Sequence, residues 1–158
     1  MEKSIILILD NIRSVHNVGS LFRTSDGVGV GRLFLCGTTP TPVDRFGRKR
    51  SDFTKVSLGA EDSLSWEYFA SAEEALIRAK EENYFVLALE QSENSLTYDT
   101  LFSQEKIALI LGTEVTGLPK EIIQLCDAVI EIPMRGKKES LNVSVAGGIA
   151  LYELTKKK

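Results

Sequence analysis

Three stretches of the chain combine glycine with amide, hydroxyl and charged side chains. They are the stretch 17–24, NVGSLFRT, the stretch 109–118, LILGTEVTGL, and the stretch 132–148, IPMRGKKESLNVSVAGG. Glycine lets a backbone approach a ligand closely, and exposed N–H groups at the start of a helix bind polar or anionic groups. These stretches are therefore the candidates for a functional site, although each also has an ordinary structural interpretation.

The first stretch offers an amide, Asn17, and a guanidinium, Arg23. The two residues are six positions apart, so they do not stack on one face of a helix. A capping asparagine in a loop could still meet an arginine nearly two turns further on if the loop folds back. The alternative for Arg23 is an ordinary surface salt bridge.

The second stretch contains the end of an apolar run and the polar residues that follow it. Residues 107–111 are predicted to form a buried strand, which leads straight into Gly112 and Glu114. Ligands in α/β sheets bind beyond the carboxyl ends of the strands, so this position favours a ligand site. The alternative is a bare turn.

The third stretch leads from a strand that is predicted to end at Ile132, through a polar loop, into the last helix. That helix is predicted to span 140–156, with Ser140 and Asn142 at its start. Residues 146–148, Ala-Gly-Gly, fill space poorly, and each glycine in mid-helix costs roughly 1 kcal/mol relative to alanine. They indicate tight packing or passage through a confined space. The alternative is an ordinary capped helix.

The elements that must position these stretches alternate along the chain. Nearly continuous apolar runs predict strands that are covered on both faces, at 4–9, 32–36, 84–89, 107–111 and 128–132. Between them, helices are predicted at 17–28 with Asn17 as the cap, 71–82, 118–125 and 140–156. This order predicts an α/β domain with a mostly parallel sheet flanked by helices. Residues 37–70 are the hardest to interpret, and we expect an exposed functional loop there.

Composition excludes several classes of protein. No run approaches the ~18 apolar residues of a membrane span, and the apolar run at 5–9 is too short for a signal peptide. With one histidine and two distant cysteines, no metal-ligand spacing exists, so we expect no metal site and no disulfide. We therefore expect a cytoplasmic protein without a membrane partner.

Two glycine-rich stretches resemble nucleotide-binding motifs but fail on context. GVGVG at 27–31 closes a predicted helix and precedes a strand, whereas a dinucleotide fingerprint follows a strand and opens a helix. We interpret it as a helix stop and turn. The stretch 112–117 has the glycine spacing of a P-loop, but Leu118 and Pro119 stand where lysine and serine or threonine are required.

Charge gives a mixed indication about nucleic acid. The net charge of −3 argues against a protein that coats nucleic acid by bulk electrostatics. Cations nevertheless gather in RFGRKR at 45–50, which is either a solvated loop or a loop that contacts phosphate.

Taken together, the three stretches resemble the SpoU (TrmH-like) branch of the SPOUT superfamily of RNA methyltransferases. They match that branch's motifs N-x-G…R-T, G-x-E-x-x-G-L and I-P-M-x-G-x-x-x-S-L-N-V-S-V-A, and they cover nearly the whole chain. The resemblance implies methylation of a ribose 2′-hydroxyl in tRNA or rRNA, with S-adenosylmethionine as donor and S-adenosylhomocysteine as product. It also implies a deep C-terminal trefoil knot and a homodimer whose active site joins both subunits.

The resemblance assigns roles by motif position. It implies that Arg23 is the catalytic arginine, that Asn17 orients it, and that Glu114, Ser140 and Asn142 shape the site. The implied cofactor-binding residues are Leu89, Gly112, Glu114, Gly117, Ile132, Met134, Ser140 and Leu141.

Many relatives carry a separate RNA-binding domain, whereas here a single methyltransferase domain is expected over residues 1–158. RNA would then be held by that domain and its dimer partner. The candidate RNA-binding residues are Arg13, Arg45, Arg48, Lys49, Arg50, Lys137 and Lys138.

Methyl transfer to oxygen needs close, in-line placement more than acid–base machinery. A guanidinium keeps its proton at neutral pH and is a poor base, so we favour for Arg23 the role of a clamp that holds the substrate phosphate and hydroxyl and stabilises developing alkoxide. Two alternatives remain at this point: a catalytically silent RNA-binding module on the same fold, and a SPOUT methyltransferase that acts on a base.

Overall fold

The first strand shows how the sheet is built. In β1 (Ser4–Asp10), Ile5, Leu7 and Leu9 pack into the core on one face of the sheet, while Ile6 and Ile8 pack into the core on the other. Successive side chains of a strand point to opposite faces, so a continuous apolar run marks a strand that is covered on both sides.

A computed structural model describes residues 2–156, and within that range seven strands form one sheet in the order β3-β2-β1-β6-β4-β7-β5. The other strands are β2 (Arg32–Cys36), β3 (Ser65–Phe69), β4 (Phe85–Leu89), β5 (Leu96–Thr97), β6 (Lys106–Leu111) and β7 (Ala128–Glu131). Every ladder between the named strands is parallel. The predicted α/β architecture with a mostly parallel sheet is therefore confirmed.

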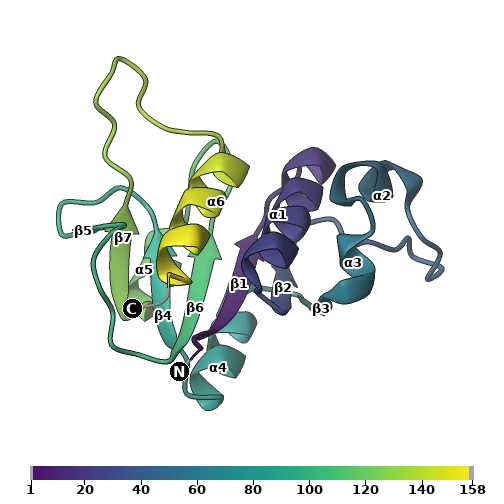
Figure 1. The fold of residues 1–158 in the computed structure, drawn as a ribbon, viewed down its shortest axis with the longest axis horizontal. Coiled ribbons are helices and arrows are strands. Elements are labelled where there is room, and N and C mark those ends of the chain that lie inside the picture. The colour runs from purple at the N-terminus through teal and green to yellow at the C-terminus, as the bar shows by residue number, and fades with distance from the viewer. Residues whose placement is uncertain (1, 157–158) are drawn as a thin grey trace.

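Helices cover both faces of the sheet. They are α1 (Val15–Val28), α2 (Ser51–Ser57), α3 (Ala60–Ser63), α4 (Ala72–Glu81), α5 (Lys120–Leu125) and α6 (Val143–Leu154). Buried residues of α1, α2 and α6 share one core cluster, and those of α4 pack with α5 into the other. Figure 1 shows α6 beside α1 on the same face, with the loop between β7 and α6 projecting beyond the sheet. None of the described helices is long and apolar enough to cross a membrane.

Two predicted helix starts were wrong by a few residues. Helix α1 is capped by Ser14, whose hydroxyl accepts a hydrogen bond from the backbone N–H of Asn17 at 3.1 Å. Asn17 therefore lies in the first turn rather than at the cap. Helix α6 begins after Asn142, which is its cap, rather than at Ser140. In both cases the residue whose side-chain oxygen reaches a backbone N–H of the first turn sets the start.

The C-terminal end of α1 and one of the two glycines of α6 agree with the sequence analysis, whereas Gly148 is not tightly packed, since an added Cβ would lie 3.6 Å from Cγ2 of Thr24. Gly29 ends α1 with φ 81°, a left-handed conformation, as expected for a helix stop. A Cβ added at Gly147 would lie 2.7 Å from Cδ2 of Leu21 and 2.8 Å from Cδ1 of Leu111. The absence of a side chain there lets α6 pack tightly against α1 and β6.

Residues 37–70 do not form the expected exposed loop. They contain α2, α3 and β3, and Phe53 of α2 is fully buried with its ring 5.0 Å from that of Phe22. Buried Glu61 accepts hydrogen bonds from the hydroxyls of Thr54 and Ser57, which ties α3 to α2. The segment is a packed part of the domain because it supplies apolar cover for the sheet.

Candidate active site

A cavity of about 320 Å³ lies where β4, β6 and β7 end. Its walls come from the residues that follow these strands and from the loop that leads into α6. They include all eight residues that the sequence analysis assigned to the cofactor: Leu89, Gly112, Glu114, Gly117, Ile132, Met134, Ser140 and Leu141. The carboxyl edge of a parallel sheet is the usual place for a ligand site, and this volume falls in the usual range for one.

The charged groups around this cavity are all of one sign. Its lining includes the carboxylates of Glu90, Glu114, Glu131 and Glu139, and it includes no lysine, arginine or histidine. Carboxylates attract a cation and repel phosphate. The cavity is therefore suited to a positively charged ligand rather than to a nucleotide phosphate.

The loop after β6 is closed by its glycines. Gly117 has φ 67°, and a Cβ added at Gly112 would lie 2.5 Å from the carbonyl carbon of Gly117. The backbone N–H of Leu118 donates to Oε2 of Glu90 at 2.9 Å. The loop can fold back this closely only without side chains at the two glycines, and Glu90 anchors its end.

A hydrogen-bonded network joins the three motifs. The side-chain amide of Asn17 donates to Oε1 of Glu114 at 3.2 Å, and that of Asn142 donates to Oδ1 of Asn17 at 3.1 Å. Oδ1 of Asn142 accepts hydrogen bonds from the backbone N–H groups of Ser144 and Val145 at the start of α6. The network fixes the start of α6 against the start of α1 and holds one carboxylate oxygen of Glu114.

Within one subunit, Arg23 does not line this cavity. It is exposed, and it lines a second hollow between α1, α2 and α6 rather than the acidic cavity. Asn17 makes its side-chain contacts with Glu114 and Asn142, not with Arg23. The surface salt bridge considered for Arg23 is not formed among residues 2–156.

The candidate RNA-binding residues divide into paired and unpaired cations. Three residues of RFGRKR have a carboxylate partner: Arg48 with Asp44 at 3.0 Å, Lys49 with Asp62 at 2.9 Å and Arg50 with Asp52 at 2.8 Å. The side-chain hydrogen bond from Arg50 lowers the pKa of Asp52 below its ordinary value. The run is thus more nearly neutral than its sequence suggests.

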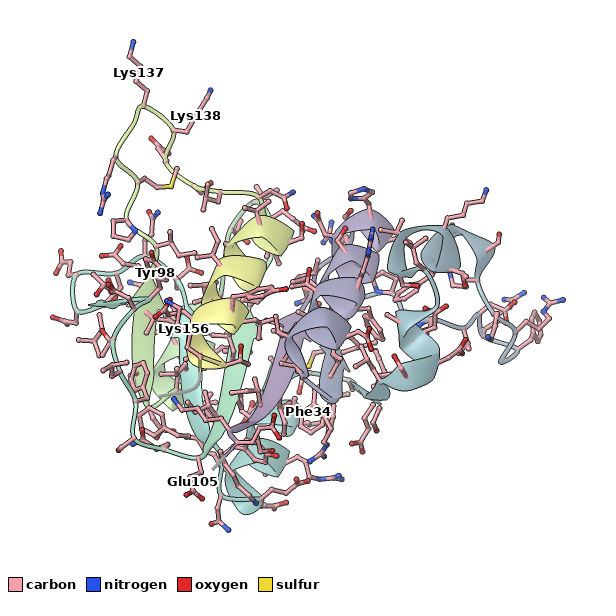
Figure 2. All side chains as sticks on the ribbon, viewed as in Figure 1. Phe34, Tyr98, Glu105, Lys137, Lys138 and Lys156 are labelled. Carbon is pink, nitrogen blue, oxygen red and sulfur yellow. The ribbon has the colours of Figure 1, made fainter. Side chains whose placement is uncertain are left out.

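The remaining candidates extend into solvent. Arg45 has no carboxylate partner among the described residues, and its guanidinium lies 4.8 Å from the ring centroid of exposed Phe46. Arg13 is also exposed. Figure 2 shows Lys137 and Lys138 at the tip of the loop between β7 and α6, with both side chains pointing away from the rest of the molecule.

Several residues of these sites were missed from the sequence. Glu90 and Glu131 lie at the ends of predicted strands, so the rule that ligands bind at strand ends could have found them. Lys55 lines the hollow of Arg23 but stands 32 positions further along the chain, and no motif marks it.

Residues 2–156 contain no group of three or more His, Cys, Asp and Glu side chains that could hold a metal ion.

Comparison with known proteins identifies the family. Residues 4–152 match the SpoU rRNA Methylase family, and the chain belongs to it. The chain is 29% identical to the 23S rRNA (guanosine-2′-O-)-methyltransferase RlmB of Escherichia coli (strain K12), over 100% of this chain and 62% of that protein. It is 30% identical to the putative TrmH family tRNA/rRNA methyltransferase YacO of Bacillus subtilis (strain 168), over 99% of this chain and 60% of that protein. The chain therefore spans less than two thirds of these relatives.

The fold also matches solved structures. An AdoMet-bound rRNA methyltransferase from Sinorhizobium meliloti superposes with a TM-score of 0.85 at 28% identity, over 98% of this chain and 56% of that one. The predicted membership of the SpoU (TrmH-like) branch is confirmed.

Proposed function

We propose that this chain transfers a methyl group from S-adenosylmethionine to a ribose 2′-hydroxyl of tRNA or rRNA and releases S-adenosylhomocysteine. The acidic cavity carries the proposal, because residues of the second and third motifs line it at the carboxyl edge of the sheet and its charged side chains are all carboxylates. The names of the relatives support the same activity, since one is called a guanosine-2′-O-methyltransferase and one structural neighbour holds AdoMet.

The cavity fits this cofactor chemically. S-adenosylmethionine carries a sulfonium, an ammonium and one carboxylate, so it is a net cation, and Glu90, Glu114, Glu131 and Glu139 supply charge that compensates its two cationic groups. Apolar side chains in the same walls suit an adenine ring, and the glycine backbone permits close approach. The residues that would hold it are Leu89, Gly112, Glu114, Gly117, Ile132, Met134, Ser140 and Leu141. The cofactor supplies an activated methyl group.

The chain's own residues then have to place and activate the hydroxyl. In this proposal the Asn142–Asn17–Glu114 network keeps the cavity wall in place relative to α1. Arg23 clamps the substrate phosphate and hydroxyl and stabilises negative charge that develops on the oxygen. It is not the base, because a guanidinium stays protonated at neutral pH. The hydroxyl proton passes to water as the new O–CH3 bond forms and the S–CH3 bond breaks.

The proposed active site needs a second subunit. Helix α6 presents Val145, Ile149 and Tyr152 to solvent, with 50%, 36% and 58% of each residue exposed. These apolar residues share one face of the helix and adjoin the hollow that contains Arg23. A homodimer that covers this face would bring Arg23 of one subunit towards the cavity of the other, which is how Arg23 and the cofactor would meet.

Two further features complete the proposal. A trefoil knot at the carboxyl side of the sheet is supported by the tight packing of Gly147 between Leu21 and Leu111, because a threaded helix needs small residues.

A cytoplasmic location is supported by the free thiols of Cys36 and Cys126. Burial raises the pKa of Cys126 to about 11, so this thiol stays protonated.

A filter assay with methyl-labelled S-adenosylmethionine and bulk tRNA and rRNA tests the activity. We expect label on the RNA. RNA binding without label transfer would favour a silent RNA-binding module. Replacing ribose by 2′-deoxyribose at the labelled nucleotide should abolish labelling, whereas a base methyltransferase would still label the deoxy substrate.

A further inference from the structure

The hollow that contains Arg23 is as uniformly cationic as the cofactor cavity is acidic. His16, Ser20, Arg23 and Thr24 of α1 line it together with Lys55 of α2 and Tyr152 of α6. Its charged and titratable groups thus comprise His16, Arg23, Lys55 and the phenol of Tyr152, and its lining includes no carboxylate. Three side chains that can carry positive charge and three hydroxyl groups face the same space.

Arg23, Lys55 and the imidazole of His16 are available to a ligand. His16, Arg23 and Lys55 are all exposed, and none forms an ion pair or side-chain hydrogen bond with residues 2–156. Arg48, Lys49 and Arg50, by contrast, each have a carboxylate partner. Arg23 and Lys55 in this hollow therefore both lack a carboxylate partner among the described residues, whereas within RFGRKR only Arg45 does.

The hollow depends on a glycine of the first motif. A Cβ added at Gly19 would lie 2.9 Å from Cβ of Val56 and 3.3 Å from the backbone nitrogen of Ser57. Gly19 therefore lets α2 pack directly against α1, and this packing brings Lys55 to the face of α1 that carries Arg23. The N-x-G motif and Lys55 are connected in this way, although they are far apart in sequence.

The spacing of the side chains that line the hollow indicates a ligand that is an extended polyanion. His16 and Arg23 are seven residues apart on α1, which is about 10 Å along a helix axis. This length exceeds a single phosphate group. Cations and hydroxyls that follow a backbone are the usual partners of nucleic-acid phosphates.

We propose that His16 and Lys55 act with Arg23 to bind consecutive phosphates of the RNA backbone beside the target nucleotide. This inference rests on the proposed function, because the RNA is the methyl acceptor there. It assigns to Lys55 a binding role and not a catalytic one.

The test is the salt dependence of RNA binding by the full chain, measured by filter binding of bulk tRNA and rRNA at rising KCl. Lys55→Gln should weaken binding and lower the slope of log K against log[KCl] by about 0.7–0.9, the value for one lost phosphate contact. Lys55→Arg should keep the wild-type slope. Lys80→Gln is the matched control, since Lys80 is an exposed lysine on α4, on the opposite face of the sheet, and it should leave the slope unchanged.

The outcomes separate this inference from the proposed function. A wild-type slope in Lys55→Gln, or an equal fall in Lys80→Gln, would overturn the inference even if the protein methylates RNA. A fall confined to Lys55→Gln would support it even if no methyl transfer occurs, in which case the proposed function fails. If the wild-type protein binds no RNA, both are contradicted. Unchanged S-adenosylmethionine binding by calorimetry would show that Lys55→Gln is folded.

Discussion

The side-chain amide of Asn142 donates to the side-chain oxygen of Asn17 across 3.1 Å, although the two residues are 125 positions apart in the chain. This contact joins the start of α6 to the start of α1. The same Asn17 side chain donates to Glu114 at the cavity wall. Asn142 therefore has two tasks, as the cap of α6 and as a fixed point of the cavity.

Two substitutions at Asn142 separate these tasks. Asn142→Ala should cost about 1 kcal/mol of folding stability, because the start of α6 loses its cap, and it should also lower cofactor affinity. Asn142→Asp keeps the cap oxygen but loses the donor to Asn17, so it should retain most of the stability and still weaken cofactor binding. Thermal unfolding and calorimetry measure the two effects. An Asn142→Ala protein as stable as wild type would show that the cap contributes nothing.

Adjacent glycines in α6 should respond in opposite directions. Gly147→Ala should destabilise the protein by about 1–3 kcal/mol, because the new methyl group would overlap Leu21 and Leu111. At Gly148 the nearest atom to an added Cβ is Cγ2 of Thr24 at 3.6 Å, an ordinary contact. Gly148→Ala should therefore be neutral or stabilising by up to about 1 kcal/mol. Denaturant unfolding compares them, and equal effects would contradict the packing described here.

The basic run at 45–50 should contribute to RNA binding mainly through Arg45. Arg45→Ala should lower the salt slope by about 0.7–0.9, because this guanidinium has no carboxylate partner among the described residues. Lys49→Ala should lower it less, since Asp62 already neutralises Lys49. Cofactor affinity should be the same in both variants. If neither variant changes the slope, the run is only a solvated loop.

The exposed face of α6 should hold two subunits together. Wild-type protein should scatter light as a particle of twice the 17.5 kDa of one chain, and Val145→Asp should shift it towards the monomer. Ile77→Asp is the control, because Ile77 is also 50% exposed but lies on α4, on the other side of the sheet. A wild-type monomer at micromolar concentration would contradict the proposed dimer and the shared active site.

The sequence predicted the central strands well and the edges of the sheet poorly. Runs such as 107–111 are apolar throughout because both faces of β6 are buried. This pattern does not depend on which side chains pack against the strand. β3 escaped prediction because it lies at the edge of the sheet, where Tyr68 remains 51% exposed and the strand SWEYF carries polar residues. β5 is too short to leave a pattern.

For the site, the motifs predicted which residues face the cavity but not how the motifs are arranged in space. The eight cofactor candidates share one cavity because each ends or follows a strand, or precedes a helix, at the same edge of the sheet. Spacing in the sequence could not show that Arg23 lies in a separate hollow. It also could not show that the acidic residues near RFGRKR neutralise most of that run, because ion pairs depend on the folded loop.

Arg23→Ala tests the central claim most directly when methyl transfer and cofactor binding are measured on the same protein. Label from S-adenosylmethionine is followed into RNA nucleosides by mass spectrometry, and cofactor affinity is followed by calorimetry. The wild-type protein should produce 2′-O-methylated ribonucleosides. Arg23→Ala should bind the cofactor almost as well and produce none, since Arg23 lies outside the acidic cavity. Arg23→Lys should recover little activity, because a point charge cannot replace the planar guanidinium. Methylated bases in place of 2′-O-methylated ribose, or substantial activity in Arg23→Ala, would contradict the account.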